Sequence, residues 1–67
     1  MPTIRVEMFE GRTVEQKRAF AEALIEAAVR TIGASPESVD ILCFDIQKQD
    51  WATGGRLWSD PAPQKAG

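Results

Sequence analysis

The sequence contains no histidine and no tyrosine, and it has a single cysteine, Cys43. Without histidine there is no Ser-His-Asp triad, no Cys-His pair and no imidazole to act as a general acid or base. One cysteine excludes an internal disulfide, and we expect no metal site built from several cysteine or histidine ligands. If the protein is an enzyme, its protons must move through carboxylates, lysines or the amino terminus of the chain.

The sequence also lacks a long hydrophobic run and a large excess of positive or negative charge. No apolar run approaches the roughly 20 residues that span a bilayer, and the first residues show no signal-peptide pattern. The net charge is −2, with acids and bases interspersed, so there is no basic surface for nucleic acid or for an anionic membrane. We therefore expect a cytoplasmic protein that binds neither nucleic acid nor membrane.

The residues that are present indicate a small globular domain. Hydrophobic residues make up 43% and charged residues 27% of the chain, which favours a folded state over disorder. With 67 residues, we expect one domain over 1–67, with its core at 2–59 and a flexible tail at 60–67. A core of this size rarely supplies more than about 3–5 kcal/mol, so we expect a homo-oligomer.

Two strands and one helix are predicted. Residues 3–9 alternate apolar and polar side chains, as a half-buried strand does. Thr13 and Gln16 fit a capping box at the start of an amphipathic helix, and Gly33 is placed to end it. Residues 39–46 are apolar enough for a strand that is buried on much of both faces.

The order of strand, helix and strand predicts an α/β fold. About thirty residues separate the two strands, a length that suits a crossover helix and therefore parallel strands. Such a βαβ unit leaves one sheet face and both edges uncovered, so we expect oligomerisation to complete the sheet. The shorter segments are predicted to be a turn or 3₁₀ segment at "ASPES", a polar loop at "QKQD", a tight turn at "TGG" and a short edge strand at "RLWS".

Pro2 is the first candidate for chemistry. If Met1 is removed, Pro2 becomes the amino terminus and carries a secondary amine whose direction is fixed by the ring. Burial and nearby cations lower the pKa of such an amine, so a dry, positively charged pocket would make it a neutral general base that needs no cofactor. The structural alternative is a proline that merely begins the strand.

The stretch "MPTIRVEMFEGRTVEQKRAFAEAL" resembles the 4-oxalocrotonate tautomerase family. The likeness rests on Pro2, the alternating strand, "EGR" before the capped helix and "EQK" in its first turn. "SPESV" and the W-x-x-GG pattern at 51–55 extend it over residues 2–59. The resemblance implies a βαβ protomer, a four-stranded sheet in each dimer, and usually a hexamer built as a trimer of dimers. It also implies tautomerase chemistry with Pro2 as the base.

The resemblance also gives roles to three other residues. Arg12 binds a substrate carboxylate, in the pocket of a neighbouring chain, because a guanidinium matches a carboxylate bidentately; the alternative is a solvated arginine. Trp51 occupies an aromatic position that lines the pocket and excludes water, although tryptophan is also common at oligomer interfaces. Phe9 is a second candidate for the apolar wall of this pocket.

Asp40 departs from the family pattern, because well-studied members carry a second arginine there. An anion at this position removes a partner for a second substrate carboxylate and removes charge stabilisation for an enolate. It also raises the pKa of a nearby amine, which opposes a base. Asp40 could instead activate water or orient the substrate while a protonated Pro2 donates a proton, as a carboxylate and the proline do in relatives that hydrate, dehalogenate or decarboxylate three-carbon acids. It could also pair with Arg5 or Arg56 at an interface.

Three functions are therefore open. The first is a cofactor-independent isomerase that moves a proton on a small 2-oxo or enol carboxylic acid, with Pro2 as base and Arg12 and Trp51 in the pocket. The second is a hydratase-, dehalogenase- or decarboxylase-like enzyme that uses Pro2, Arg12 and Asp40. The third is a non-catalytic oligomer that kept the fold. The resemblance favours the first.

Overall fold

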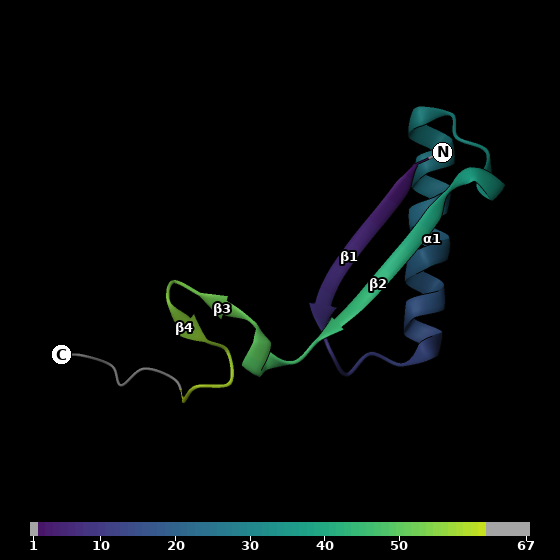
Figure 1. Ribbon diagram of the computed structural model, residues 1–67. Coiled ribbons are helices and arrows are strands. Elements are labelled where there is room, and N and C mark those ends of the chain that lie inside the picture. The colour runs from purple at the N-terminus through teal and green to yellow at the C-terminus, as the bar shows by residue number, and fades with distance from the viewer. Residues whose placement is uncertain (1, 62–67) are drawn as a thin grey trace.

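The computed structural model describes residues 2–61. Along the chain the elements are β1 (Thr3–Phe9), α1 (Val14–Ile32), η1 (Pro36–Ser38), β2 (Asp40–Ile46), η2 (Lys48–Asp50), β3 (Ala52–Thr53) and β4 (Arg56–Leu57). Strands β1 and β2 pair in parallel, and α1 connects them across one face of the pair (Figure 1). The predicted βαβ fold is therefore confirmed.

Local sequence determines both ends of α1. The Thr13 hydroxyl oxygen accepts a hydrogen bond from the Gln16 amide (3.1 Å), and the Gln16 side chain accepts one from the Thr13 amide (2.9 Å). This capping box satisfies two amides that the helix leaves without partners. Gly33 ends the helix in the left-handed region, with φ of 71°, where a side chain would be strained. Both predicted boundaries are confirmed.

The register of β1 and β2 gives each sheet face a different composition. The helix-side pairs are Ile4 with Ile41, Val6 with Cys43, and Met8 with Asp45, and the outer-face pairs are Thr3 with Asp40, Arg5 with Leu42, Glu7 with Phe44, and Phe9 with Ile46. On the helix side, Lys17 Nζ lies 2.6 Å from the Asp45 carboxylate, which connects the first turns of α1 to the end of β2.

The outer face of the sheet is open in the protomer. Leu42 is 41% exposed and Phe44 is 36% exposed, and among the described residues the only buried hydrophobic ones are Ala28 and Val39. The expectation that residues 39–46 are buried on much of both faces is wrong for a single chain. One helix can cover only one face of a two-stranded sheet, so the apolar side chains on the other face remain exposed.

A short hairpin follows β2. Strands β3 and β4 pair antiparallel, and the turn between them consists of Gly54 and Gly55, with φ of 62° and 83°. Positive φ at both central residues is the signature of a turn whose twist matches a two-residue hairpin. The predicted turn is confirmed, and of the predicted edge strand "RLWS" only Arg56–Leu57 forms a strand. The hairpin lies beyond the carboxyl ends of β1 and β2 (Figure 1).

The segment "QKQD" is not the irregular loop that its polarity suggests. It forms the 3₁₀ turn η2, in which the Asp50 amide donates to the Gln47 carbonyl (2.8 Å). These backbone bonds depend on local geometry, which composition does not reveal. Of the expected tail, residues 62–67 lie outside the described residues, whereas Asp60 accepts a hydrogen bond from the Leu57 amide (3.2 Å) and donates one to the Leu57 carbonyl (3.0 Å).

Removing the capping box should destabilise the protein measurably. We expect Thr13→Ala to lower the free energy of unfolding by about 1 kcal/mol, because the Gln16 amide loses its acceptor. For a domain of this size that corresponds to a fall in Tm of about 4–8 °C, measured by thermal denaturation at equal protein concentration. Thr13→Ser keeps the hydroxyl and should remain close to the parent. Equal losses in both variants would contradict a role for the cap.

Candidate functional site

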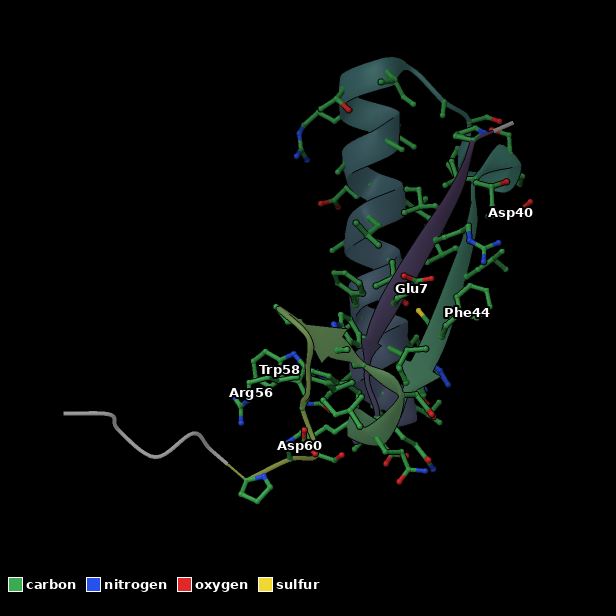
Figure 2. All side chains as sticks on the ribbon, turned by 60° about the vertical axis from the view of Figure 1, so that its left-hand side comes forward. Glu7, Asp40, Phe44, Arg56, Trp58 and Asp60 are labelled. Carbon is green, nitrogen blue, oxygen red and sulfur yellow. The ribbon has the colours of Figure 1, made fainter. Side chains whose placement is uncertain are left out.

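Pro2 and Asp40 lie together at the amino ends of the strands. The Asp40 amide donates a hydrogen bond to the Pro2 carbonyl (3.0 Å). Thr3, which follows Pro2, is the register partner of Asp40 in the sheet. Pro2 therefore directly precedes β1, and the hydrogen bond from the Asp40 amide fixes its backbone at the start of the sheet. Asp40 lies at the end of the sheet opposite the hairpin (Figure 2).

Three aromatic rings lie together at the carboxyl ends of the strands. The Phe9 ring centroid is 4.6 Å from that of Trp51 and 5.4 Å from that of Trp58, and both ring pairs are tilted. Such separations are typical of favourable aromatic pairs. We call Phe9, Trp51 and Trp58 the aromatic cluster. It joins the end of β1 to the hairpin, and it brings together two of the predicted site residues, Phe9 and Trp51.

Arg12 lies at the same end of the sheet, in the segment between β1 and α1. It lines a cavity of about 350 Å³ together with Val6, Met8, Gln16, Lys17 and Phe20. Val6 and Met8 belong to the helix side of β1, so the cavity lies between the strand and the first turns of α1. Lys17 is already paired with Asp45, so Arg12 is the cation of this lining that can receive an anionic group beside the apolar walls.

The predicted site residues thus form two groups at opposite ends of β1. This strand has seven residues, and at about 3.3 Å per residue its ends are roughly 20 Å apart. Pro2 and Asp40 are at one end. Phe9 and Trp51 are together at the other end, where Arg12 also lies, in a helix-side cavity that neither ring lines. No small molecule can contact both groups of a single protomer, so any site that combines them must be shared between chains.

Asp40 forms no ion pair within the described part of the protomer. The pairs found among residues 2–61 are Lys17 with Asp45, Arg18 with Glu15, and Arg30 with Glu26. The Arg5 guanidinium instead lies over the Phe44 ring, 4.7 Å from its centroid, and Arg56 donates to the Pro61 carbonyl (2.7 Å). The two pairings expected for Asp40 at an interface are not formed inside one chain.

Trp58 is the residue that sequence reasoning missed. It was assigned to the edge strand without a role, yet it packs on Phe9 and its amide donates to the Trp51 carbonyl (2.9 Å). The signal was present in the sequence, because a two-residue turn at Gly54–Gly55 places residue 58 opposite residue 51.

Within residues 2–61, no group of three or more histidine, cysteine, aspartate or glutamate side chains is arranged to hold a metal ion. In the same part of the chain, no helix has both the length and the apolar character needed to cross a membrane.

Comparison with known proteins gives consistent matches over most of the chain. The family model described as tautomerase enzyme matches residues 2–60. The 2-hydroxymuconate tautomerase of Bacillus subtilis is 42% identical over 60 residues, which cover 90% of this chain and 97% of that protein. A probable tautomerase of Bacillus cereus is also 42% identical over 60 residues, with 90% and 98% covered.

Solved structures agree with these sequence matches. The crystal structure of YwhB, a homologue of 4-oxalocrotonate tautomerase, superimposes with a TM-score of 0.86 at 39% identity and covers 91% of this chain and 100% of its own. A heterohexamer 4-oxalocrotonate tautomerase from Chloroflexus aurantiacus gives a TM-score of 0.83 at 30% identity, with 90% and 97% covered.

Deleting the central ring of the aromatic cluster should expose both tryptophans. We expect Phe9→Ala to shift tryptophan emission to longer wavelength, because the rings of Trp51 and Trp58 then lose their shared neighbour and contact water. Phe44→Ala is the matched control, since that ring lies under Arg5 on the outer face. Equal spectra for Phe9→Ala and the parent would show that the cluster does not form.

Proposed function

Because the chain belongs to the 4-oxalocrotonate tautomerase family, we propose that it is a cofactor-independent isomerase acting on a small 2-oxo or enol carboxylic acid. In this reaction a proton leaves the carbon alpha to a carbonyl, or the enol oxygen, and returns elsewhere on the conjugated system. Pro2 is the general base, which requires removal of Met1 so that the ring nitrogen is a free amine. The observation that carries the proposal is the division of the site residues between the two ends of β1.

An antiparallel pairing of protomers resolves this division. When two copies join their sheets edge to edge about a two-fold axis, the strands of the two copies run in opposite directions. The amino end of each sheet then lies beside the carboxyl end of the other. Pro2 of one protomer is brought toward the partner's Arg12 and the partner's Trp51. The two-fold axis generates a second, equivalent site at the other end of the pair.

Each residue then has a distinct role. Arg12 binds the substrate carboxylate through its planar guanidinium, whose paired N–H donors match the two carboxylate oxygens. Phe9 and Trp51 form the apolar wall that excludes water, and a water-poor setting favours the neutral form of an amine. Pro2 takes and returns the proton.

The same pairing accounts for the open surfaces of the protomer. Edge pairing covers one strand edge of each copy, whereas the exposed Leu42 and Phe44 of the outer face need a further layer. The edge-paired dimer leaves this face open, whereas a hexamer formed as a trimer of such dimers can pack the outer faces of its sheets against one another. We therefore propose a homo-oligomer, with the hexamer as the form that buries the outer faces.

The position of Asp40 supports a second candidate. Its backbone is hydrogen bonded to Pro2, so its carboxylate belongs to the same end of the sheet as the amine. A carboxylate there can take a proton from water while a protonated Pro2 donates one, as hydration or hydrolytic dehalogenation of a three-carbon acid requires. In decarboxylation, the carboxylate would orient the substrate and the protonated Pro2 would deliver a proton to the carbon that loses carbon dioxide. Release of halide or carbon dioxide from a panel of unsaturated acids separates this reaction from ketonisation of an enol acid.

A shared site makes a distinctive prediction for mixed oligomers. Pro2→Ala should remove most activity, because the secondary amine and its fixed direction are lost, and Arg12→Ala should weaken binding of the carboxylate. When the two variants are unfolded together and refolded in equal amounts, half the pairs are mixed and each mixed pair has one intact site. Ketonisation measured spectrophotometrically should return to about a quarter of the parent rate.

The controls define what would contradict this arrangement. Mass spectrometry must first show that Met1 is absent, because a retained Met1 acylates the ring nitrogen. Each variant refolded by itself should stay inactive. If the mixture is no more active than its components, the two residues do not meet across subunits.

Reversing the charge at position 40 should change substrate preference. We expect Asp40→Arg to increase kcat/KM for a dicarboxylate dienol by about tenfold, equivalent to about 1.4 kcal/mol, because a cation then faces the second carboxylate. Asp40→Asn, which removes the charge without reversing it, should give a smaller gain. Unchanged kinetics in both variants, measured as initial rates against substrate concentration, would exclude Asp40 from the substrate's surroundings.

A further inference from the structure

The hairpin presents two tryptophans on one face. Thr53 pairs with Arg56, and the Trp58 amide donates to the Trp51 carbonyl (2.9 Å), so Trp51 and Trp58 are the next opposed pair. Side chains two residues apart in a strand point to the same side. Trp51, Thr53, Arg56 and Trp58 therefore share a face, which we call the tryptophan face. Leu57 points to the opposite side.

Trp58 is fixed in place but remains accessible. Its indole Nε1 donates to the Thr53 hydroxyl (2.9 Å), and its ring packs on Phe9 at 5.4 Å between centroids. Nevertheless 52% of its surface is exposed. A large ring that is already held by a hydrogen bond and by packing offers flat apolar surface with little further loss of conformational freedom.

The charges around the tryptophan face favour an anionic ligand with one acid group. Arg56 lies on this face, beside Trp58 (Figure 2). At the other end of the sheet Asp40 is an unpaired carboxylate among the described residues, and in the antiparallel pairing above it lies on the far side of the same shared site. One end of the site therefore attracts a carboxylate, and the other disfavours a second one.

We propose that Trp58 is a specificity-determining residue that extends the apolar wall of Phe9 and Trp51. It selects 2-oxo or enol monocarboxylates that carry a flat apolar substituent, such as an aryl group, over small dicarboxylates. The substituent stacks on the exposed indole while the acid group is bound by Arg12, and Arg56 adds positive charge at the same end of the sheet. This inference rests on the proposed function, because it specifies the substrate of that same site.

The kinetic test compares two substrates in matched variants. For Trp58→Ala we expect the ratio of kcat/KM for an arylenolpyruvate to that for an aliphatic dicarboxylate dienol to fall about 2- to 12-fold, the equivalent of one aromatic pair. The loss should lie in KM for the aryl substrate, with kcat little changed. Leu57→Ala removes an exposed side chain from the opposite face of the hairpin and should leave the ratio unaltered.

A binding test does not depend on turnover. The chain has two tryptophans and no tyrosine, so Trp51→Phe leaves Trp58 as the single strong fluorophore and keeps a ring at position 51. Combined with Pro2→Ala, this protein should show saturable quenching by an aryl-substituted 2-oxo acid, and much weaker quenching by an aliphatic 2-oxo dicarboxylate.

The outcomes separate this inference from the proposed function. Activity that survives Pro2→Ala overturns the catalytic role of Pro2, while the quenching still reports on Trp58. An unchanged substrate ratio or an absence of saturable quenching overturns the role of Trp58 and leaves Pro2 untouched. Trp58→Ala that dissociates the oligomer on size-exclusion chromatography also overturns it, since Trp58 is then an interface residue.

Discussion

The parallel pairing of β1 with β2 is the constraint on which the rest of the molecule depends. It requires a crossover, and α1 supplies one across a single face of the sheet. It also aligns the two strands, so that Pro2 and Asp40 lie at their beginnings and Phe9 and Trp51 at or beyond their ends. A hairpin of two strands would have placed the beginning of one beside the end of the other inside a single chain. In the proposed oligomer, the parallel arrangement leaves that meeting to a second copy.

The small core follows from the same constraint. With one layer of helix on two strands, the described residues bury few apolar side chains completely, and Leu42 and Phe44 remain open on the outer face. Burial of apolar surface contributes roughly 25 cal/mol per Å², so the protomer forgoes much of the stabilisation available to its sequence. In the proposed oligomer, stability and catalysis arise from the same contacts, because the surfaces that complete the fold also complete the site.

Sequence reasoning succeeded where the signal is local. The alternation of residues 3–9, the capping pair Thr13 and Gln16, and the glycines at positions 33, 54 and 55 each specify a backbone geometry within a few residues. It failed where neighbours distant in the sequence decide. The burial of β2 depends on how many layers cover the sheet, and the 3₁₀ turn at Lys48–Asp50 depends on how the chain leaves that strand.

The candidate site was only partly predictable for a related reason. Residue types and the resemblance identify Pro2, Arg12 and Asp40 one by one, but the distance between them requires the register of the sheet. Trp58 was overlooked because its neighbour Phe9 is 49 positions away in the chain, and only the hairpin geometry brings the two rings together. The turn at Gly54–Gly55 signals only that Trp58 lies opposite Trp51, and nothing in the hairpin segment signals the contact with Phe9.

The separation of the site residues has a consequence for how such a chain can diverge. A substitution near Pro2 affects the pocket of the protomer that carries it, whereas a substitution near Arg12 affects a pocket to which another protomer contributes the amine. If the gene were duplicated, one copy could lose Pro2 and the other Arg12. A mixed pair of the two products would still form one complete site in the proposed oligomer. In the proposed oligomer, a heteromeric pair would therefore need no new contact between subunits.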